Sequence, residues 1–95
     1  MTAIQDAQNK TKVANSQFPD VAAEQAAGQA TEVFQQFRQF PTVGAARLAA
    51  MIAANRANEA CIAAATKHGA APSPWDFAAT AWRGIADGLR NNILP

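Results

Sequence analysis

Alanine recurs at heptad spacing through the middle of the chain, and this repeat constrains the fold more than any other feature. Its members are separated by alternating steps of four and three residues: Ala46, Ala50, Ala53, Ala57, Ala60 and Ala64. Steps of four and three place side chains on one side of an α-helix. Because no side chain in the repeat extends past Cβ, we expect a neighbouring helix to lie close against it.

The composition also favours helices. Alanine accounts for 25 of the 95 residues, against four valines, five isoleucines and no tyrosine. Alanine has the highest helix propensity, whereas β-branched and aromatic residues favour strands. We therefore predict an all-α fold. Only 22 larger apolar residues, cysteine included, are left to build a core. A domain of this length buries only about 60–65% of its unfolded surface, so this small core predicts a partner or an oligomer.

Signals for helix ends predict two long helices in the middle of the chain. The first is expected from Pro19 or Asp20 to Gln39, with Ser16 or Asp20 as its N-cap and Pro41 as a stop. The second carries the alanine repeat and is expected from an N-cap at Thr42 to residue 67 or 68. Gly69 then fits the position just beyond its end.

A third helix is expected after a linker rich in glycine, alanine and proline. Ser73 as N-cap, Pro74 in the first turn and Asp76 three residues after Ser73 form a capping-box start signal. This helix should run to about Asn91. It has one stripe of large side chains and a second stripe with two glycines: Ala78, Trp82, Ile85 and Leu89, then Phe77, Ala81, Gly84 and Gly88. Since glycine is costly inside a helix, the second stripe predicts a close backbone approach; the alternative is an exposed face that tolerates glycine.

The chain divides into residues 1–17, a polar N-terminal tail or short helix, and residues 18–95, a single helical domain. A short helix over 3–12 with Thr2 as its cap is the second alternative for the polar segment. Short connections place consecutive helices side by side in opposite directions. We therefore predict a small antiparallel three- to four-helix bundle with the alanine-rich helix at its centre.

No residue pattern predicts catalysis, a cofactor or a metal. Cys61 and His68 are two helical turns apart, about 10 Å along the axis, which is too far for a nucleophile and its base. Cys61 among alanines is typical of a small buried side chain. The glutamates lack the Glu-x-x-His spacing of helical metal sites. We predict that the chain is not an enzyme; a buried pocket around Asn55 and Glu59 would favour a ligand binder or enzyme instead.

The charge pattern disfavours nucleic acid as a partner. The net charge is +1, the isoelectric point is about 8.0, and the basic residues are scattered rather than clustered. A helix-turn-helix is a weaker interpretation, because the start of its recognition helix would offer only Arg47. No apolar run reaches the about 18–20 residues of a membrane span. Without a secretory signal at the N-terminus, the expected location is the cytoplasm or a particle assembled there.

These features predict a non-enzymatic structural or assembly subunit that acts through helix–helix protein contacts. It would work in a homo-oligomer or a larger complex, such as a virion or an enzyme complex. The alternative is a small soluble binding module that regulates or inhibits one protein partner. The interface candidates are Ala46, Ala50, Ala53, Ala57, Ala60, Ala64, Trp75, Trp82, Gly84 and Gly88.

Two points about these candidates stay open. The alanine-rich helix has a second contact face, which carries Leu48, Met51, Ile52 and Ile62 mixed with Asn55 and Glu59. A single neighbouring helix could use only one of the two faces. Of the tryptophans, Trp82 is expected in the core, whereas Trp75 fits the core and a surface contact equally well.

Overall fold

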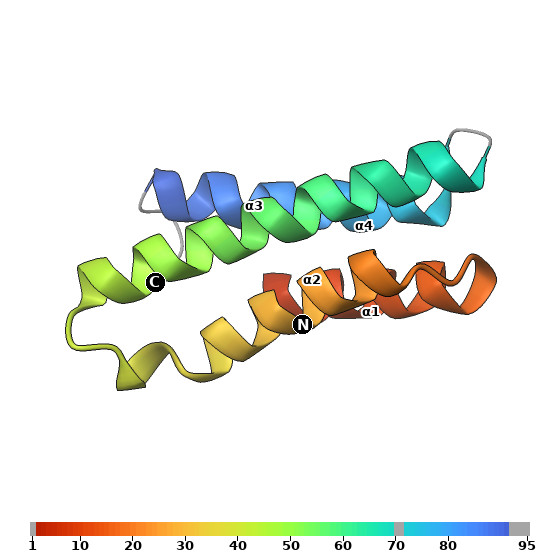
Figure 1. Cartoon of the computed structure of the whole chain (residues 1–95). Coiled ribbons are helices and arrows are strands. Elements are labelled where there is room, and N and C mark those ends of the chain that lie inside the picture. Colours follow the sequence, from red (N-terminus) through yellow and green to blue (C-terminus); the bar gives the residue numbers. More distant parts are fainter. Residues whose placement is uncertain (1, 70–71, 92–95) are drawn as a thin grey trace.

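The computed structural model describes residues 2–69 and 72–91, which form four α-helices and one short 3-10 helix (Figure 1). The all-α prediction is confirmed. In chain order the elements are α1 (Ala3–Gln17), α2 (Val21–Gln35), η1 (Phe37–Gln39), α3 (Val43–His68) and α4 (Pro74–Arg90).

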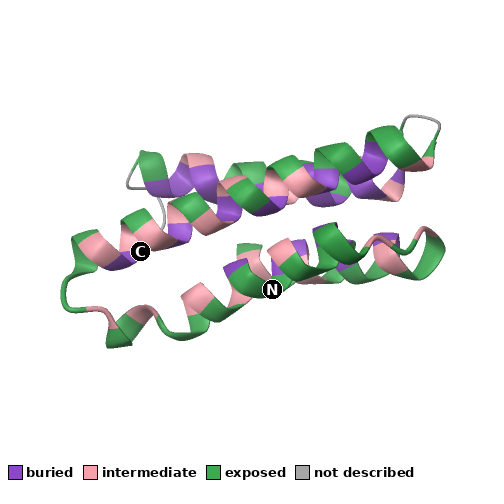
Figure 2. Ribbon diagram, in the orientation of Figure 1, coloured by how far each residue is buried: buried purple, intermediate pink, exposed green. Residues whose placement is uncertain are grey.

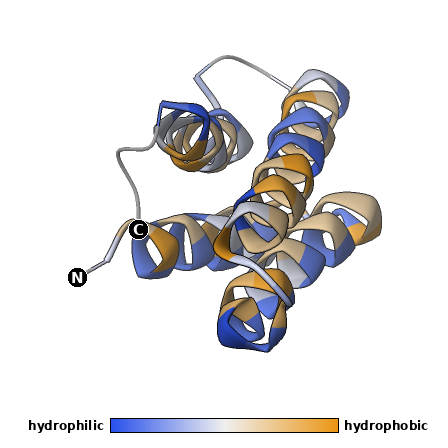
Figure 3. Cartoon of the chain, turned by 90° about the vertical axis from the view of Figure 1, so that its left-hand side faces the viewer, coloured by the Kyte–Doolittle hydropathy of each residue, from blue (hydrophilic) through white to orange (hydrophobic). Residues whose placement is uncertain are grey.

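The four helices form an antiparallel bundle in which each helix has two neighbours. Consecutive helices pack side by side, and α4 returns alongside α1, so the helices surround one core (Figures 1 and 3). The contact of α3 with α4 is the most extensive, and that of α1 with α2 is the slightest. The bundle measures 41 × 23 × 22 Å. The central alanine-rich helix is therefore α3, which packs against both α2 and α4.

Local signals place the ends of α3 where the sequence predicts them. The Thr42 hydroxyl accepts a hydrogen bond from the backbone N–H of Ala45 at 3.0 Å. This bond satisfies one of the free N–H groups of the first turn. At the other end Gly69 has a φ of 132°. This positive φ lies outside the α-helical region, so α3 ends at His68. Glycine adopts it readily because it has no Cβ.

The polar N-terminal segment is a helix in the structure, not a tail. Thr2 and Gln5 form a capping box: the Gln5 N–H donates to the Thr2 hydroxyl at 3.1 Å, and the Thr2 N–H donates to the Gln5 side chain at 3.0 Å. The helix continues to Gln17, five residues beyond the predicted end. It lies along α4, and its Ala7 and Ala14 belong to the same core as residues of the other helices.

The predicted helix over 20–39 ends earlier than expected, at Gln35. Asp20 is its N-cap, as predicted, and accepts from the backbone N–H of Ala23. Beyond Gln35 the chain tightens into η1, where the Gln39 N–H bonds the Gln36 carbonyl at 2.8 Å. Short 3-10 turns of this kind are common at the C-terminal ends of α-helices. Pro41 disfavours the α conformation at Phe40, which is extended, so the helical backbone stops after Gln39.

Buried residues occur on all four α-helices (Figure 2). Most of them are alanines, and large side chains in the core are few. The largest fully buried residues are Trp75, Trp82, Ile85 and Cys61. On α3 the buried row is Ala46, Ala50, Ala54, Ala57, Cys61 and Ala64. Ala53 and Ala60 of the predicted repeat lie at the edge of this row and are only half-buried. The repeat therefore predicts the small face correctly but misplaces its centre by part of a turn.

The prediction of a close backbone approach at Gly84 is wrong. A Cβ built on Gly84 meets no atom within 4 Å, and the same holds for Gly28 in α2. Both glycines are exposed. Gly88, in contrast, is buried. The second stripe of α4 is thus largely a solvent-exposed side of the helix rather than a tight contact.

This open space gives a stability prediction. We expect Gly84→Ala and Gly28→Ala each to raise the free energy of unfolding by about 0.5–1 kcal/mol, because alanine restricts the unfolded chain and fits without contact. Gly69→Ala should instead destabilise by about 1–3 kcal/mol, since its positive φ excludes a Cβ at low energy. Urea unfolding followed by circular dichroism measures all three. A loss of stability in Gly84→Ala would show that its surroundings are not open.

Candidate functional site

The two tryptophans proposed as interface residues are both fully buried. The Trp75 indole N–H donates to the Phe18 carbonyl at 2.8 Å, and the Trp82 indole N–H donates to the Thr11 hydroxyl at 3.0 Å. A buried indole needs such an acceptor, and both acceptors come from this chain. The core role predicted for Trp82 is confirmed, and Trp75 is also a core residue.

Thr11 is a structural residue that the sequence prediction did not single out. It is buried, and its hydroxyl donates to the Ala7 carbonyl at 2.8 Å while accepting from Trp82. A signal was present, because Ala7, Thr11 and Ala14 are small residues at steps of four and three. Because the surrounding residues are mostly polar, this narrow stripe was not recognised as a buried face. Thr11 joins α1 to α4 by a fully satisfied buried bond.

The alanine repeat serves packing inside the bundle. Ala46, Ala50, Ala57 and Ala64 are buried against neighbouring helices of the same chain. Ala53 lines a shallow groove between α2 and α3, and Ala60 lines another near the start of α2. Since the buried alanines are already covered, they offer no surface to a second protein in this structure.

The second face of α3 points away from the bundle. It carries three large aliphatic residues, Leu48, Ile52 and Ile62, which are 55%, 40% and 50% exposed. Met51, which the sequence grouped with them, is half-buried against the core. We define the outer face of α3 as Leu48, Ile52, Asn55, Arg56, Glu59, Ile62 and Thr66.

Asn55 and Glu59 lie on this outer face. Asn55 is half-buried and Glu59 is exposed, so they do not converge on a buried pocket. The arrangement that would have favoured a ligand binder or enzyme at these two residues is therefore not present. Their position instead places polar groups between the aliphatic residues at either end of the face.

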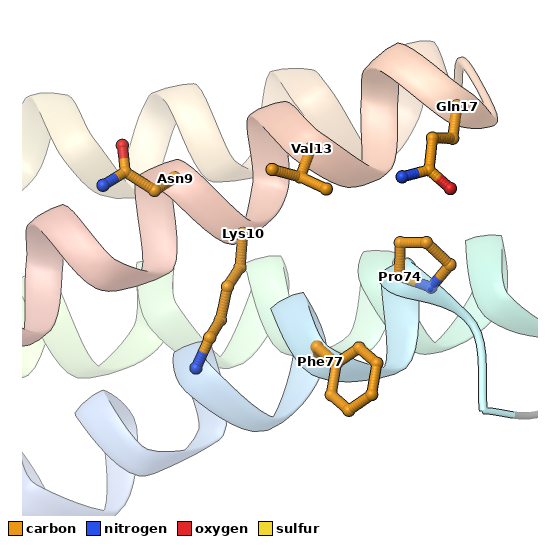
Figure 4. Close-up of a pocket in the computed structure, with 6 residues that line it drawn as sticks. All are labelled: Asn9, Lys10, Val13, Gln17, Pro74 and Phe77. Carbon is orange, nitrogen blue, oxygen red and sulfur yellow. The ribbon is translucent and has the colours of Figure 1, made fainter.

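A second apolar surface lies between α1 and the start of α4. It is an open groove of about 370 Å³ in which Val13 of α1 lies above Pro74 and Phe77 of α4 (Figure 4). Val13 and Phe77 are exposed. The polar lining comes from α1 alone: Asn9, Lys10 and Gln17. Lys10 also pairs with Asp6 at 2.9 Å. This groove suits a narrow apolar segment rather than a charged ligand.

The only cysteine of the chain is not placed to act as a nucleophile. Burial, together with the negative charge of nearby Asp20, raises the pKa of the Cys61 thiol to about 12. A thiol must lose its proton to become a nucleophile, so Cys61 acts here as a small buried side chain, as predicted. His68 is paired with Asp20 instead, with 3.2 Å between Nε2 and Oδ2.

Across residues 2–69 and 72–91, no three His, Cys, Asp or Glu side chains gather in a way that could hold a metal ion. Of the helices in that same part of the chain, none combines the length and the apolarity needed to cross a lipid bilayer.

Known proteins give no further guide. Comparison of the chain with protein families, with curated proteins and with solved structures found no match.

The Asp20–His68 pair gives a prediction about acid stability. The N–H of Ala23 and the contact with His68 lower the pKa of Asp20 below its usual value, although burial opposes them. A carboxyl group with a lowered pKa stabilises the fold above its unfolded pKa, about 4, and this contribution is lost as the pH falls through the folded value. We therefore expect stability to decline below about pH 4.

Two variants distinguish the role of Asp20 as the N-cap of α2 from the effect of its charge. Asp20→Ala should lower the free energy of unfolding by about 0.5–2 kcal/mol at neutral pH, because α2 loses its N-cap. Asp20→Asn keeps an acceptor for the cap but cannot titrate, so its stability should depend less on pH in the acid range. Urea unfolding at several pH values measures both. An acid profile of Asp20→Asn identical to that of the wild type would contradict the lowered pKa.

Proposed function

We propose that the chain is a non-enzymatic structural or assembly subunit, which associates with protein through the outer face of α3 in a homo-oligomer or a larger complex. One observation carries this proposal. On α3 the buried row is made of alanine and cysteine, whereas the aliphatic residues Leu48, Ile52 and Ile62 are exposed on the opposite side.

This arrangement is the reverse of what a solitary domain favours. Full burial of a leucine or isoleucine stabilises a protein by about 1.5–3 kcal/mol relative to exposure. Single exposed apolar residues are common and need no explanation. Here, however, three of them share one helical face in a chain whose core is mostly alanine. Their burial against another protein would supply apolar contact that the bundle itself does not make.

Light scattering across a concentration series tests the proposal, with circular dichroism on the same samples. We expect the wild-type mass to rise with concentration. A variant with Leu48→Gln, Ile52→Gln and Ile62→Gln should remain a helical monomer, because glutamine preserves helix propensity but not apolar contact. Val13→Gln with Val21→Gln changes exposed valines of α1 and α2 and serves as the control.

The outcomes are distinct. An oligomer lost in the triple variant but kept in the control supports the outer face of α3 as the contact. A wild-type chain that stays monomeric at every concentration would remove the homo-oligomer. An oligomer that survives the triple substitution would place the contact on another surface.

The groove between α1 and α4 favours the second candidate, a monomeric module that binds one protein partner. Its apolar wall is already formed and open, as in sites that accept an amphipathic segment.

This candidate predicts a monomer that binds a naphthalene-sulfonate dye at the groove. Phe77→Ser should weaken dye binding, whereas Val43→Ser, at an exposed site on α3, should not. Equal binding by both variants would contradict a binding groove at Phe77.

A further inference from the structure

We propose that a second copy of this chain covers the outer face of α3, in an antiparallel α3–α3 pair whose twofold axis passes midway between Asn55 and Glu59. This inference rests on the proposed function and specifies its partner and geometry. Three properties of the outer face support it: its spacing, its charges and its symmetry.

The outer face has the spacing of a helix-pairing seam. Its central row advances in steps of four, three, four, three and four: Leu48, Ile52, Asn55, Glu59, Ile62 and Thr66. Alternating steps of this kind keep a row of side chains facing a partner helix. From Leu48 to Thr66 the row extends about 27 Å, at 1.5 Å per residue. It therefore runs along most of the exposed side of α3.

The order of steps is the same in both directions, so the row matches an inverted copy of itself. In an antiparallel pair centred between Asn55 and Glu59, Ile52 of one copy lies opposite Ile62 of the other. Leu48 lies opposite the methyl group of Thr66, and Asn55 lies opposite Glu59. Twofold symmetry repeats each of these pairings. Two isoleucine layers then enclose a polar centre, which is shielded from water on both sides.

The charges at the centre favour the antiparallel direction. The inverted copy brings the Asn55 amide and the Arg56 guanidinium of one chain to the Glu59 carboxylate of the other. Within residues 2–69 and 72–91, neither Arg56 nor Glu59 takes part in an ion pair. A parallel pair in register would instead place Glu59 against Glu59 and would leave the Arg56 side chains, which flank the row, on opposite sides of the interface. The like-charge contact of Glu59 is unfavourable, so the charges favour the antiparallel orientation.

The expected affinity is modest. A contact made mainly by one helix from each copy falls in the range of small interfaces, which are weak or transient. We therefore expect a dissociation constant on the order of micromolar, with a dimer that weakens as salt rises. The concentration series must extend well above this value.

Charge reversal tests the pairing. Arg56→Glu and Glu59→Arg should each weaken the dimer at least about tenfold, because each creates like charges across the twofold axis. The double variant should restore the affinity to within about threefold of the wild type. In it, residues 56 and 59 again carry opposite charges across the interface, with the two signs exchanged. Lys12→Glu, an exposed reversal on α1, changes the net charge by the same amount as Arg56→Glu and should leave the dimer intact.

Disulfide trapping measures the orientation directly. We expect a mixture of the Ile52→Cys chain and the Ile62→Cys chain to form a cross-linked pair under mild oxidation, and each chain alone to cross-link poorly. Cys61 remains in place, because it is buried. Circular dichroism confirms that each variant is folded.

The results separate this inference from the function on which it rests. A dimer that cross-links 52 to 52, or one in which the double charge variant shows no recovery, would overturn the antiparallel pair. In that case assembly through the outer face of α3 would still stand, provided that the glutamine variant is monomeric. A wild-type chain that is monomeric at all concentrations and salts would overturn the antiparallel pair and the homo-oligomer together.

Discussion

Trp82→Ala should lower the free energy of unfolding by about 3–5 kcal/mol, the cost typical of removing a fully buried aromatic side chain. Domains of this size have only about 5–14 kcal/mol of total stability. Most residues of the core that contains Trp82 are alanines, which cannot extend to fill the cavity. We therefore expect a large shift of the urea midpoint and partial unfolding at physiological temperature. Circular dichroism during urea titration measures the effect.

The hydrogen bond of this residue can be separated from its volume. Thr11→Val removes the hydroxyl that accepts from the Trp82 indole, which leaves a buried N–H without a partner. We expect a loss of about 1–3 kcal/mol. Thr11→Ser retains the hydroxyl and is the matched control, with a smaller loss from the missing methyl group. Equal stability of the valine and serine variants would mean that the indole–hydroxyl bond contributes nothing.

Ala57→Leu should be the second most damaging substitution, with a loss of about 1–3 kcal/mol or more from overpacking. Ala57 is fully buried on the inward side of α3, where helices pack against a row of alanine and cysteine. A leucine there needs space that the packed core does not provide. Urea unfolding measures the change, and light scattering shows whether the bundle rearranges into a different oligomer.

Two other alanines of α3 serve as controls for Ala57→Leu. Ala63→Leu lies on the exposed side and should alter stability by less than about 0.5 kcal/mol. Ala53→Leu is half-buried beside an open groove and should fall between the two. If the Ala57 and Ala63 variants were equally stable, the helices would not be closely packed at Ala57.

Local signals in the sequence account for much of the fold. Thr42 and Gly69 mark the ends of α3, and Ser73 with Asp76 marks the start of α4, because caps depend on residues only three or four positions away. The end of α2 was mispredicted because Pro41 marks the end of η1, whereas the change from α to 3-10 geometry after Gln35 has no strong local signal in the sequence.

Contacts between distant residues were not predictable in this way. The acceptors for the Trp75 and Trp82 indoles lie 57 and 71 positions earlier in the chain. These two hydrogen bonds attach α1 and the residue after it to α4. The polar composition of α1 by itself had favoured a tail. The register of the small face of α3 likewise depends on where α2 and α4 lie, which the alanine repeat alone does not determine.

The sequence analysis recognised the outer face of α3 as a second contact face. It did not include the aliphatic residues of this face among the interface candidates. The notable feature is that the large aliphatic residues lie outside and the small ones inside, and this can be seen only once burial is known. The candidate list therefore favoured the alanines, Trp75 and Trp82, several of which are buried in the bundle.

The position of the tryptophans has a spectroscopic consequence. The only two tryptophans of the chain are in α4, there is no tyrosine, and each indole donates to an acceptor in α1 or in the residue that follows it. Intrinsic fluorescence thus reports on the docking of the N-terminal segment, whereas far-ultraviolet ellipticity reports on all the helices. If that segment detaches before the rest unfolds, the emission maximum moves to longer wavelength while most of the ellipticity remains. The two tryptophans thus form a natural probe for the detachment of this segment from α4.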